Sequence, residues 1–143
     1  MSDTDMIKLY SARILALAAD MPHTTRLAAP DATAKKRAPL CGSTVTVDVL
    51  MRDGVVNDYG QDVKACALGQ AAAAVVGSHV VGLTLAHVQQ GRDQLHAMLT
   101  SDGPIPDAPF DGLEVLIPAR DYKNRHASIL LAFDATLDAI NQT

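Results

Sequence analysis

Apolar positions along the chain recur with two periodicities, one of three to four residues and one of two residues. The helical periodicity appears first along the chain, with apolar side chains at Ile7, Tyr10, Ile14 and Leu17. This spacing, behind a run of Ser, Asp and Thr, predicts an amphipathic helix that ends near Asp20. Residues 21–40 follow with three prolines and no period, which predicts a loop or an extended arm.

The alternation of apolar and polar residues typical of a strand covers residues 44–63. Val45, Val47 and Val49 alternate with polar residues, and the same alternation resumes after Asp53-Gly54. A strand pattern interrupted by Asp-Gly predicts an antiparallel hairpin with a tight turn. Its second half is long enough for a bulge or for a further strand.

The remaining apolar segments are typical of helices. From Cys66 to about Val76 nearly every residue is small and apolar, which predicts a buried helix that Gly77 ends. Two further helices are expected to begin near Thr84 and near His126. Together these elements predict an α+β fold, in which a small antiparallel sheet packs against helices on one side, within a single domain over residues 1–143.

Composition narrows the classes of function. With 143 residues, 48% of them hydrophobic, the chain can bury a core without disulfides. A net charge of −4, no Trp, three Tyr and two Phe argue against a nucleic-acid partner. The chain has no apolar run of about 20 residues, and its first residues are acidic, so neither a membrane span nor a signal peptide is expected. We therefore expect a cytoplasmic protein with free thiols.

The chain has two cysteines, Cys41 and Cys66, one on each side of the predicted hairpin. Because an antiparallel hairpin brings its ends together, the two thiols are expected to share a site. Cys66 also begins a helix, where the positive end of the helix dipole favours a thiolate. The alternative is that both are small core residues, since free cysteine is often buried and no CxxC pair is present.

His126, at the start of the last predicted helix, is the candidate for a third group of this site. A neutral imidazole beside two thiols is a metal-ligand pattern, and it is also a nucleophile and base pattern in which Cys66 would attack. The alternative is a solvated residue at the helix end.

The order of these elements and three short motifs resemble the IscU/NifU amino-terminal family of iron–sulfur cluster assembly scaffolds. The motifs are "LCGS" around Cys41, "KACALGQAAAA" around Cys66 and "IPARDYKNRHASILL" around His126. The resemblance covers roughly residues 5–140 and implies a SufE/NifU-like fold. It implies a scaffold without turnover, which binds iron or a nascent [2Fe–2S] cluster and passes it to apo-proteins. Implied partners are a cysteine desulfurase as the sulfur donor, the apo iron–sulfur proteins and chaperones.

Two departures from the family motifs change the implied ligand set. Ser43 stands where the family has an aspartate, and the third family cysteine is replaced either by His126 or by Ala127. The resemblance then implies Cys41, Cys66 and His126 as ligands. Ser43, Asp62, water or a group from a partner is left for the fourth position, because a [2Fe–2S] cluster normally takes four ligands. The same Cys₂His set suits zinc, so a zinc-binding interaction or regulatory protein on this fold is the alternative, and a Cys66/His126 sulfur- or acyl-transfer catalyst is a further one.

Overall fold

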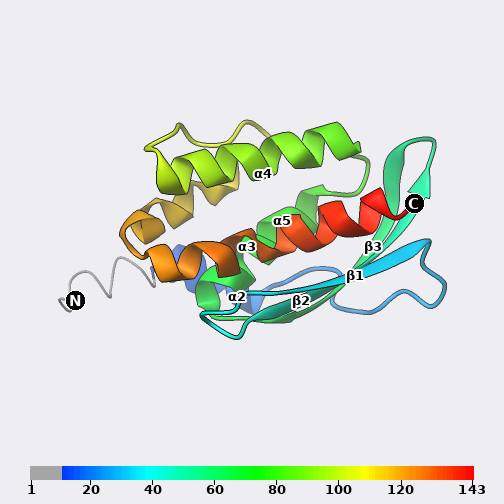
Figure 1. Ribbon diagram of the computed structural model, residues 1–143, viewed down its shortest axis with the longest axis horizontal. Coiled ribbons are helices and arrows are strands. Elements are labelled where there is room, and N and C mark those ends of the chain that lie inside the picture. Colours follow the sequence, from blue (N-terminus) through cyan, green and yellow to red (C-terminus); the bar gives the residue numbers. More distant parts are fainter. Residues whose placement is uncertain (1–10) are drawn as a thin grey trace.

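The protein is arranged in layers, with helices stacked on one face of a sheet. The computed structural model describes residues 11–143. Helix α4 (Leu85–Thr100) forms the top layer in Figure 1, α3 (Ala67–His79) and α5 (His126–Asn141) the middle layer, and the strands the bottom layer. Helix α2 (Ala12–Ala19) packs against α3. The predicted α+β fold is confirmed, while the start of the helix expected from Ile7 lies outside the described residues.

The sheet consists of β1 (Ala32–Arg37), β2 (Thr44–Arg52) and β3 (Val55–Lys64), antiparallel and in the order β1-β2-β3. Between β2 and β3, Asp53 and Gly54 both have positive φ angles, 53° and 79°, as a two-residue hairpin turn requires. A register shift after Leu50 marks a bulge. The hairpin predicted from the alternating valines is confirmed.

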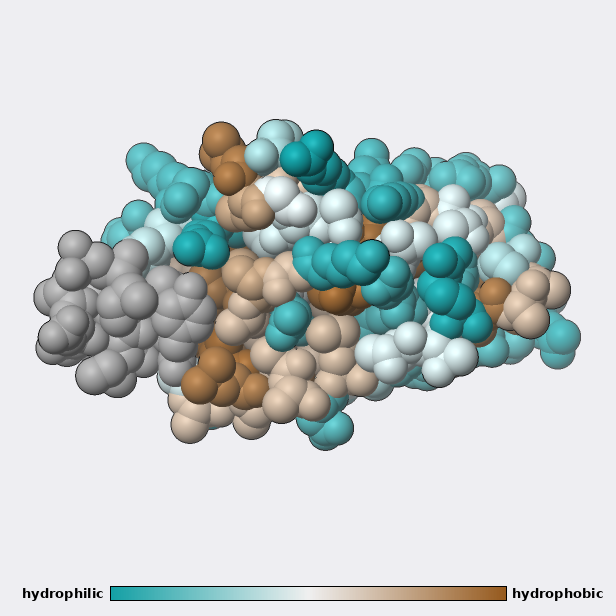
Figure 2. Space-filling view, turned by 90° about the horizontal axis from the view of Figure 1, so that it is seen from below, coloured by the Kyte–Doolittle hydropathy of each residue, from teal (hydrophilic) through white to brown (hydrophobic). Residues whose placement is uncertain are grey.

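The loop or arm predicted over residues 21–40 is wrong for its second half, which is strand β1. In this strand Ala32 and Ala34 are buried, while the three cations that follow are exposed, and Lys36 lies on the α5 side with its Nζ 3.7 Å from Asp138. Alanine and lysine are both uncommon in strands. Residues 21–31 do form a loop, and it crosses the outer face of the sheet. A Cβ on Gly60 would lie 2.7 Å from the carbonyl oxygen of Thr25. Seen from below, this side is mostly hydrophilic toward the strands, and apolar atoms gather over α2 (Figure 2).

Connections on the helical side are short or contain 3-10 helix. The 3-10 helices η1 (Asp111–Asp121) and η2 (Lys123–Arg125) lead directly into α5. Helix α4 begins as predicted, with the Thr84 hydroxyl accepting a hydrogen bond from the backbone N–H of His87. Among the described residues, no helix is both long enough and apolar enough to cross a membrane.

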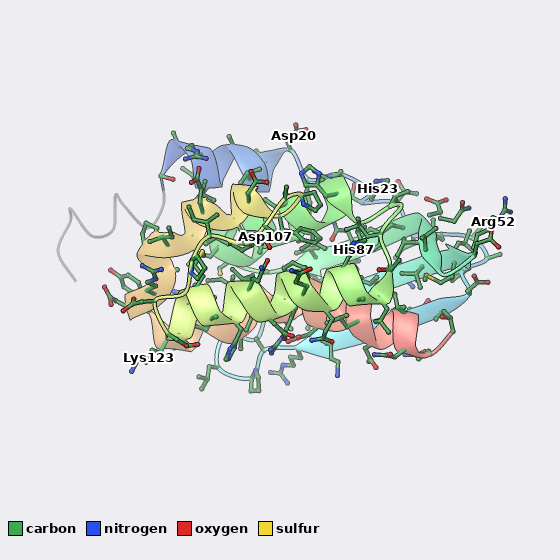
Figure 3. All side chains as sticks on the ribbon, turned by 90° about the horizontal axis from the view of Figure 1, so that it is seen from above. Asp20, His23, Arg52, His87, Asp107 and Lys123 are labelled. Atoms are coloured by element: carbon green, nitrogen blue, oxygen red, sulfur yellow. The ribbon has the colours of Figure 1, made fainter. Side chains whose placement is uncertain are left out.

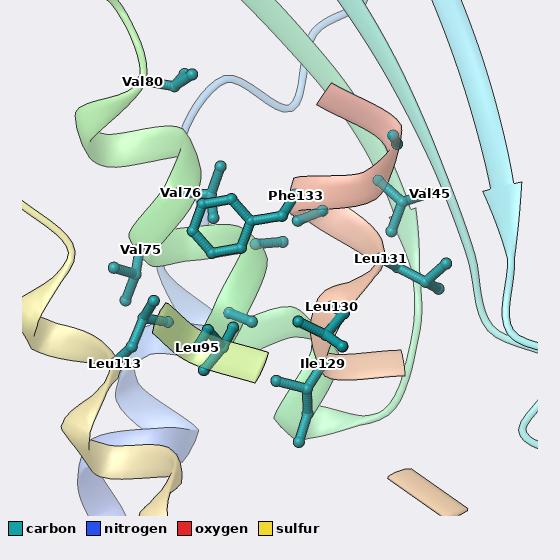
Figure 4. Close-up of a cluster of buried hydrophobic side chains, with 14 of the residues drawn as sticks. Val45, Val75, Val76, Val80, Leu95, Leu113, Ile129, Leu130, Leu131 and Phe133 are labelled. Atoms are coloured by element: carbon teal, nitrogen blue, oxygen red, sulfur yellow. The ribbon is translucent and has the colours of Figure 1, made fainter. Parts of the chain in front are cut away.

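The main core lies between the sheet and the helices (Figure 4). Phe133 of α5 is fully buried, and its ring stands edge-on to that of Phe110 with centroids 5.0 Å apart. Gly91 of α4 makes this contact possible, since a Cβ there would lie 2.5 Å from the Phe110 ring. On the sheet side, the Tyr59 hydroxyl is 2.8 Å from Thr136 Oγ1. Helix α5 is therefore the element against which β1, β2 and the helices α3 and α4 pack.

Asp48 attaches the outer loop to the sheet. Its carboxylate is fully buried and accepts hydrogen bonds from Arg26 Nε at 2.6 Å, Thr33 Oγ1 at 2.6 Å and the Leu27 backbone N–H at 3.0 Å. Burial raises the pKa of Asp48, but these hydrogen bonds and the Arg26 charge outweigh burial, so the pKa lies below its usual value. The folded state therefore favours the ionised carboxylate.

We expect Asp48→Asn to lower the free energy of unfolding by about 1–3 kcal/mol at neutral pH, because charge-assisted hydrogen bonds are lost. A depressed folded-state pKa contributes stability above the unfolded-state pKa of about 4, and that contribution is lost as the pH falls through the folded-state value. Urea unfolding between neutral pH and about pH 3 should therefore show a smaller acid loss for Asp48→Asn than for the wild type. Asp62→Asn, at an exposed carboxylate, is the control. Equal acid losses in the wild type and Asp48→Asn would contradict this role.

Candidate functional site

A cavity of about 460 Å³ opens at one end of the sheet, between the β1–β2 turn, the end of β3, the start of α3 and the segment before α5. Both cysteines lie on its wall. The lining residues are Leu40, Cys41, Gly42, Ser43, Lys64, Ala65, Cys66, Asn124 and Arg125.

Strand pairing accounts for the two thiols lying on one cavity. Thr44, the first residue of β2, pairs with Lys64, the last residue of β3. Cys41 precedes the first of these positions and Cys66 follows the second, so both thiols are brought to the same end of the hairpin. The structure therefore brings together the cysteines expected to share a site.

Cys66 is the N-cap residue of α3. Burial raises the pKa of its thiol. Hydrogen bonds from the backbone N–H groups of Gly69 and Leu68, from the Ser128 hydroxyl and from the Arg125 guanidinium lower the pKa, and their combined effect is larger than that of burial. The net pKa lies below the usual value for cysteine. Cys66 is thus the thiol prepared to act as a thiolate ligand or nucleophile, as its helix-start position predicted.

Two serines connect Cys66 to the β1–β2 turn. The sulfur of Cys66 lies 3.7 Å from Ser128 Oγ, and Ser128 donates a hydrogen bond of 3.0 Å to Ser43 Oγ. Gly69 permits this close approach of α3 and α5, since a Cβ there would lie 2.8 Å from Ser128 Oγ. Ser43, which stands at the position of the family aspartate, is therefore buried and hydrogen-bonded beside the cavity.

Cys41 is held by the segment that precedes α5. Its thiol donates to the carbonyl oxygen of Asn124, with 3.1 Å between sulfur and oxygen. The next residue, Gly42, has a φ of 69°, a conformation that favours glycine in this turn. Lys123, adjacent to Asn124, lies at the opposite end of the molecule from Arg52 at the β2–β3 turn (Figure 3). The site thus occupies the end of the molecule away from the hairpin turn.

Within residues 11–143, the charged residues that line the cavity are two cations, Lys64 and Arg125. Asp62 lies 4.0 Å from Lys64 Nζ and does not line the cavity, so the structure does not place this candidate fourth ligand beside the thiols. Because the family aspartate is Ser43 here, none of the lining residues that the structure describes carries a carboxylate. The electrostatics of the cavity therefore favour anions.

His126 begins α5 as predicted, but the structure does not place it on the cavity wall. Its ring is largely buried, with Nε2 lying 3.0 Å from the carbonyl oxygen of Ala119 and 3.1 Å from that of Arg120. Carbonyl oxygens only accept hydrogen bonds, so Nε2 is the donor in these contacts, and Nδ1 takes part in neither of them. Within residues 11–143, no three His, Cys, Asp or Glu side chains are grouped as a metal site would require.

Sequence reasoning missed three of the groups around the thiols: Lys64, Asn124 and Ser128. Asn124 contacts Cys41 through its backbone carbonyl, a group that every residue has, so its residue type gives no signal in the sequence. Ser128 carried a usable signal, because it is one of the few polar residues among the largely apolar residues of α5, and the structure buries it. The chemistry available at the site is that of two thiols, one of them favoured as a thiolate, between two cations.

Solved structures similar to this chain include two with informative names. A nitrogen-fixing NifU-like protein (N-terminal) from Brucella abortus superposes with a TM-score of 0.93 at 47% identity, over 96% of each chain. A protein from Fervidobacterium islandicum AW-1, assigned to iron–sulfur cluster assembly in the SUF system, gives a TM-score of 0.84 at 16% identity, over 94% of this chain and 98% of its own. At that identity the second likeness establishes the fold alone. No protein-family model and no curated protein matched the chain.

Proposed function

The chain belongs to the NifU-like amino-terminal family, and on that premise we propose that it is a scaffold for iron–sulfur cluster assembly. In this role it holds iron and a nascent [2Fe–2S] cluster at Cys41 and Cys66 and then releases the cluster to apo-proteins. The protein carries its cargo and performs no catalytic turnover of its own.

The observation that supports this function most strongly is the pair of thiols on one open cavity. Iron–sulfur clusters are held by cysteine thiolates, and Cys66 has a lowered pKa that favours this form. Cys41 lies on the β1–β2 turn, and the only side-chain hydrogen bond described for Cys41 itself is the one to the Asn124 carbonyl oxygen, so its thiol can turn toward the cargo as the cargo enters and leaves.

A cysteine desulfurase is the proposed sulfur donor, and Cys66 the proposed acceptor. The Cys66 thiolate attacks the outer sulfur of the donor's persulfide, so that an S–S bond forms to Cys66 while the bond to the donor cysteine breaks. The donor cysteine leaves as a thiolate, which balances the exchange without an external reductant. The Arg125 guanidinium stabilises the negative charge on Cys66 before the attack.

His126 remains a predicted ligand, with Nδ1 as the ligating atom. A metal-bound imidazole commonly donates its other N–H to a backbone carbonyl, and the Nε2 contacts with Ala119 and Arg120 have this form. Among the described residues no hydrogen bond joins His126 to either cysteine, so the structure does not support a Cys66/His126 catalyst. No group of three His, Cys, Asp or Glu side chains in the described chain favours a zinc site either.

If His126 is a ligand, His126→Ala should lower the amount of cluster retained after desalting by at least about tenfold, since losing even a group that orients a ligand typically costs that much in metal affinity. The matched control is His96→Ala, at an exposed histidine of α4. Retention of the wild-type amount by His126→Ala would remove this residue from the ligand set.

The scaffold function itself is tested by anaerobic reconstitution with iron, cysteine and a desulfurase. We expect visible charge-transfer absorption, iron and sulfide in equal amounts, and transfer of the cluster to an apo-ferredoxin. Tight uptake of zinc without cluster formation would refute the scaffold and support a zinc protein. Desulfurase-independent activity toward thioesters would point to the catalyst.

A further inference from the structure

We propose that the cavity binds a small external thiol that carries carboxylates, and that this thiol supplies a ligand which the chain itself lacks. The inference rests on the proposed scaffold function and names a ligand class for the same site. It follows from a shortage of protein ligands, from the sign of the charge around the thiols and from the shape of the site.

The shortage of ligands comes first. A [2Fe–2S] cluster prefers four thiolates, and the whole chain has two cysteines. The remaining side chains on the cavity wall offer one hydroxyl, from Ser43, and this hydroxyl already accepts a hydrogen bond from Ser128. Even with His126 in place, one position is open to an outside group.

The charge of the wall indicates which outside group fits. Of the described residues that line the cavity, Lys64 and Arg125 are cations and none is a carboxylate, so a ligand with carboxylates meets two cations. Arg125 presents a planar fork that pairs well with carboxylates, and Lys64 is 76% exposed and able to turn toward a ligand. A neutral thiol would gain nothing from either residue.

The recessed position of the thiols favours a small molecule over a second copy of the chain. Both cysteines are only partly exposed, at the wall of a cavity of about 460 Å³. Leu40 stands at the rim with 79% of its surface exposed. In two facing copies the thiols of each would be set back behind such a rim, so four protein thiolates would not converge on one cluster.

Binding of the external thiol to iron is a ligand exchange. The thiol loses its proton to solvent, its sulfur forms a bond to iron, and a water or hydroxide that held the position leaves. No electron changes hands, so the step needs no oxidant or reductant.

The test uses glutathione as the probe, because it combines one thiol with two carboxylates. S-methylglutathione keeps the carboxylates without the thiol, and 2-mercaptoethanol keeps the thiol without the carboxylates. Calorimetric titration of the apo-protein should show binding of glutathione and S-methylglutathione, weakened about tenfold by Lys64→Gln or Arg125→Gln through loss of a charge-assisted contact. Arg52→Gln, at the opposite end of the molecule, should bind like the wild type.

Reconstitution then tests ligation. Glutathione should raise the cluster yield saturably, S-methylglutathione should compete with it, and native mass spectrometry should find one chain with at least one glutathione per cluster. Absence of glutathione binding to the apo-protein, or two chains sharing a cluster without glutathione, would overturn the inference. Glutathione binding combined with no cluster in any thiol would refute the scaffold function while supporting recognition of the anionic thiol.

Discussion

Cys66→Ala is expected to retain less than about a tenth of the wild-type cluster after reconstitution, the largest functional effect in the molecule. The change removes the thiol whose pKa is lowered by the start of α3, by Ser128 and by Arg125. It also removes the proposed sulfur acceptor, so sulfide incorporation should fail before iron binding does. Visible absorption and iron and sulfide analysis after desalting measure both losses.

Alkylation of the apo-protein separates the role of Cys66 from that of Cys41. Because its pKa is lowered, Cys66 should be the thiol that reacts with iodoacetamide at pH 6, as identified by peptide mass spectrometry. Circular dichroism must show that Cys66→Ala is folded, which its partly exposed position favours. A folded Cys66→Ala that assembles and transfers a normal cluster would refute its role.

Phe133→Ala is expected to lower the free energy of unfolding by about 3–5 kcal/mol, the largest effect on stability. The ring is fully buried in α5 and meets Phe110 edge-on at 5.0 Å. Its removal leaves a cavity where α5 meets α4, because Gly91 offers no side chain to fill the space. Urea unfolding followed by circular dichroism measures the change.

Leu40→Ala is the control for this measurement. It also removes a large apolar side chain, but one that is 79% exposed, and its expected cost is below about 0.5 kcal/mol. Similar costs for the two variants would mean that α5 is not the center of the core.

Much of the fold was readable because its signals are local. Alternating valines and an Asp-Gly turn specify the β2–β3 hairpin, and the run of small residues specifies α3. Strand β1 was missed because Lys35, Lys36 and Arg37 give no apolar alternation, and its place is set by pairing with β2. The pairing partner is near in sequence, but the residues of β1 have low strand propensity, and strand formation depends more on packing against a neighbour than on residue type.

Part of the candidate site was also predictable from the sequence, and part of it was not. The β2–β3 hairpin, which the sequence pattern predicts, brings the two thiols together. The start of α3 helps to account for the lowered pKa of Cys66. The orientation of His126 was not readable, because its ring is directed by backbone carbonyls of η1. Periodicity finds which face of a helix is buried, but not which atoms a buried polar group meets.

The cations of β1 have a consequence for the protein at high concentration. In the order β1-β2-β3, no strand from the described part of the chain lies on the outer side of β1, and such a side can recruit a strand from another molecule. Lys35, Lys36 and Arg37 follow one another along it, so two molecules meeting at this side would bring like charges together. The residues that hid β1 from sequence analysis thereby protect the protein against aggregation through its own sheet.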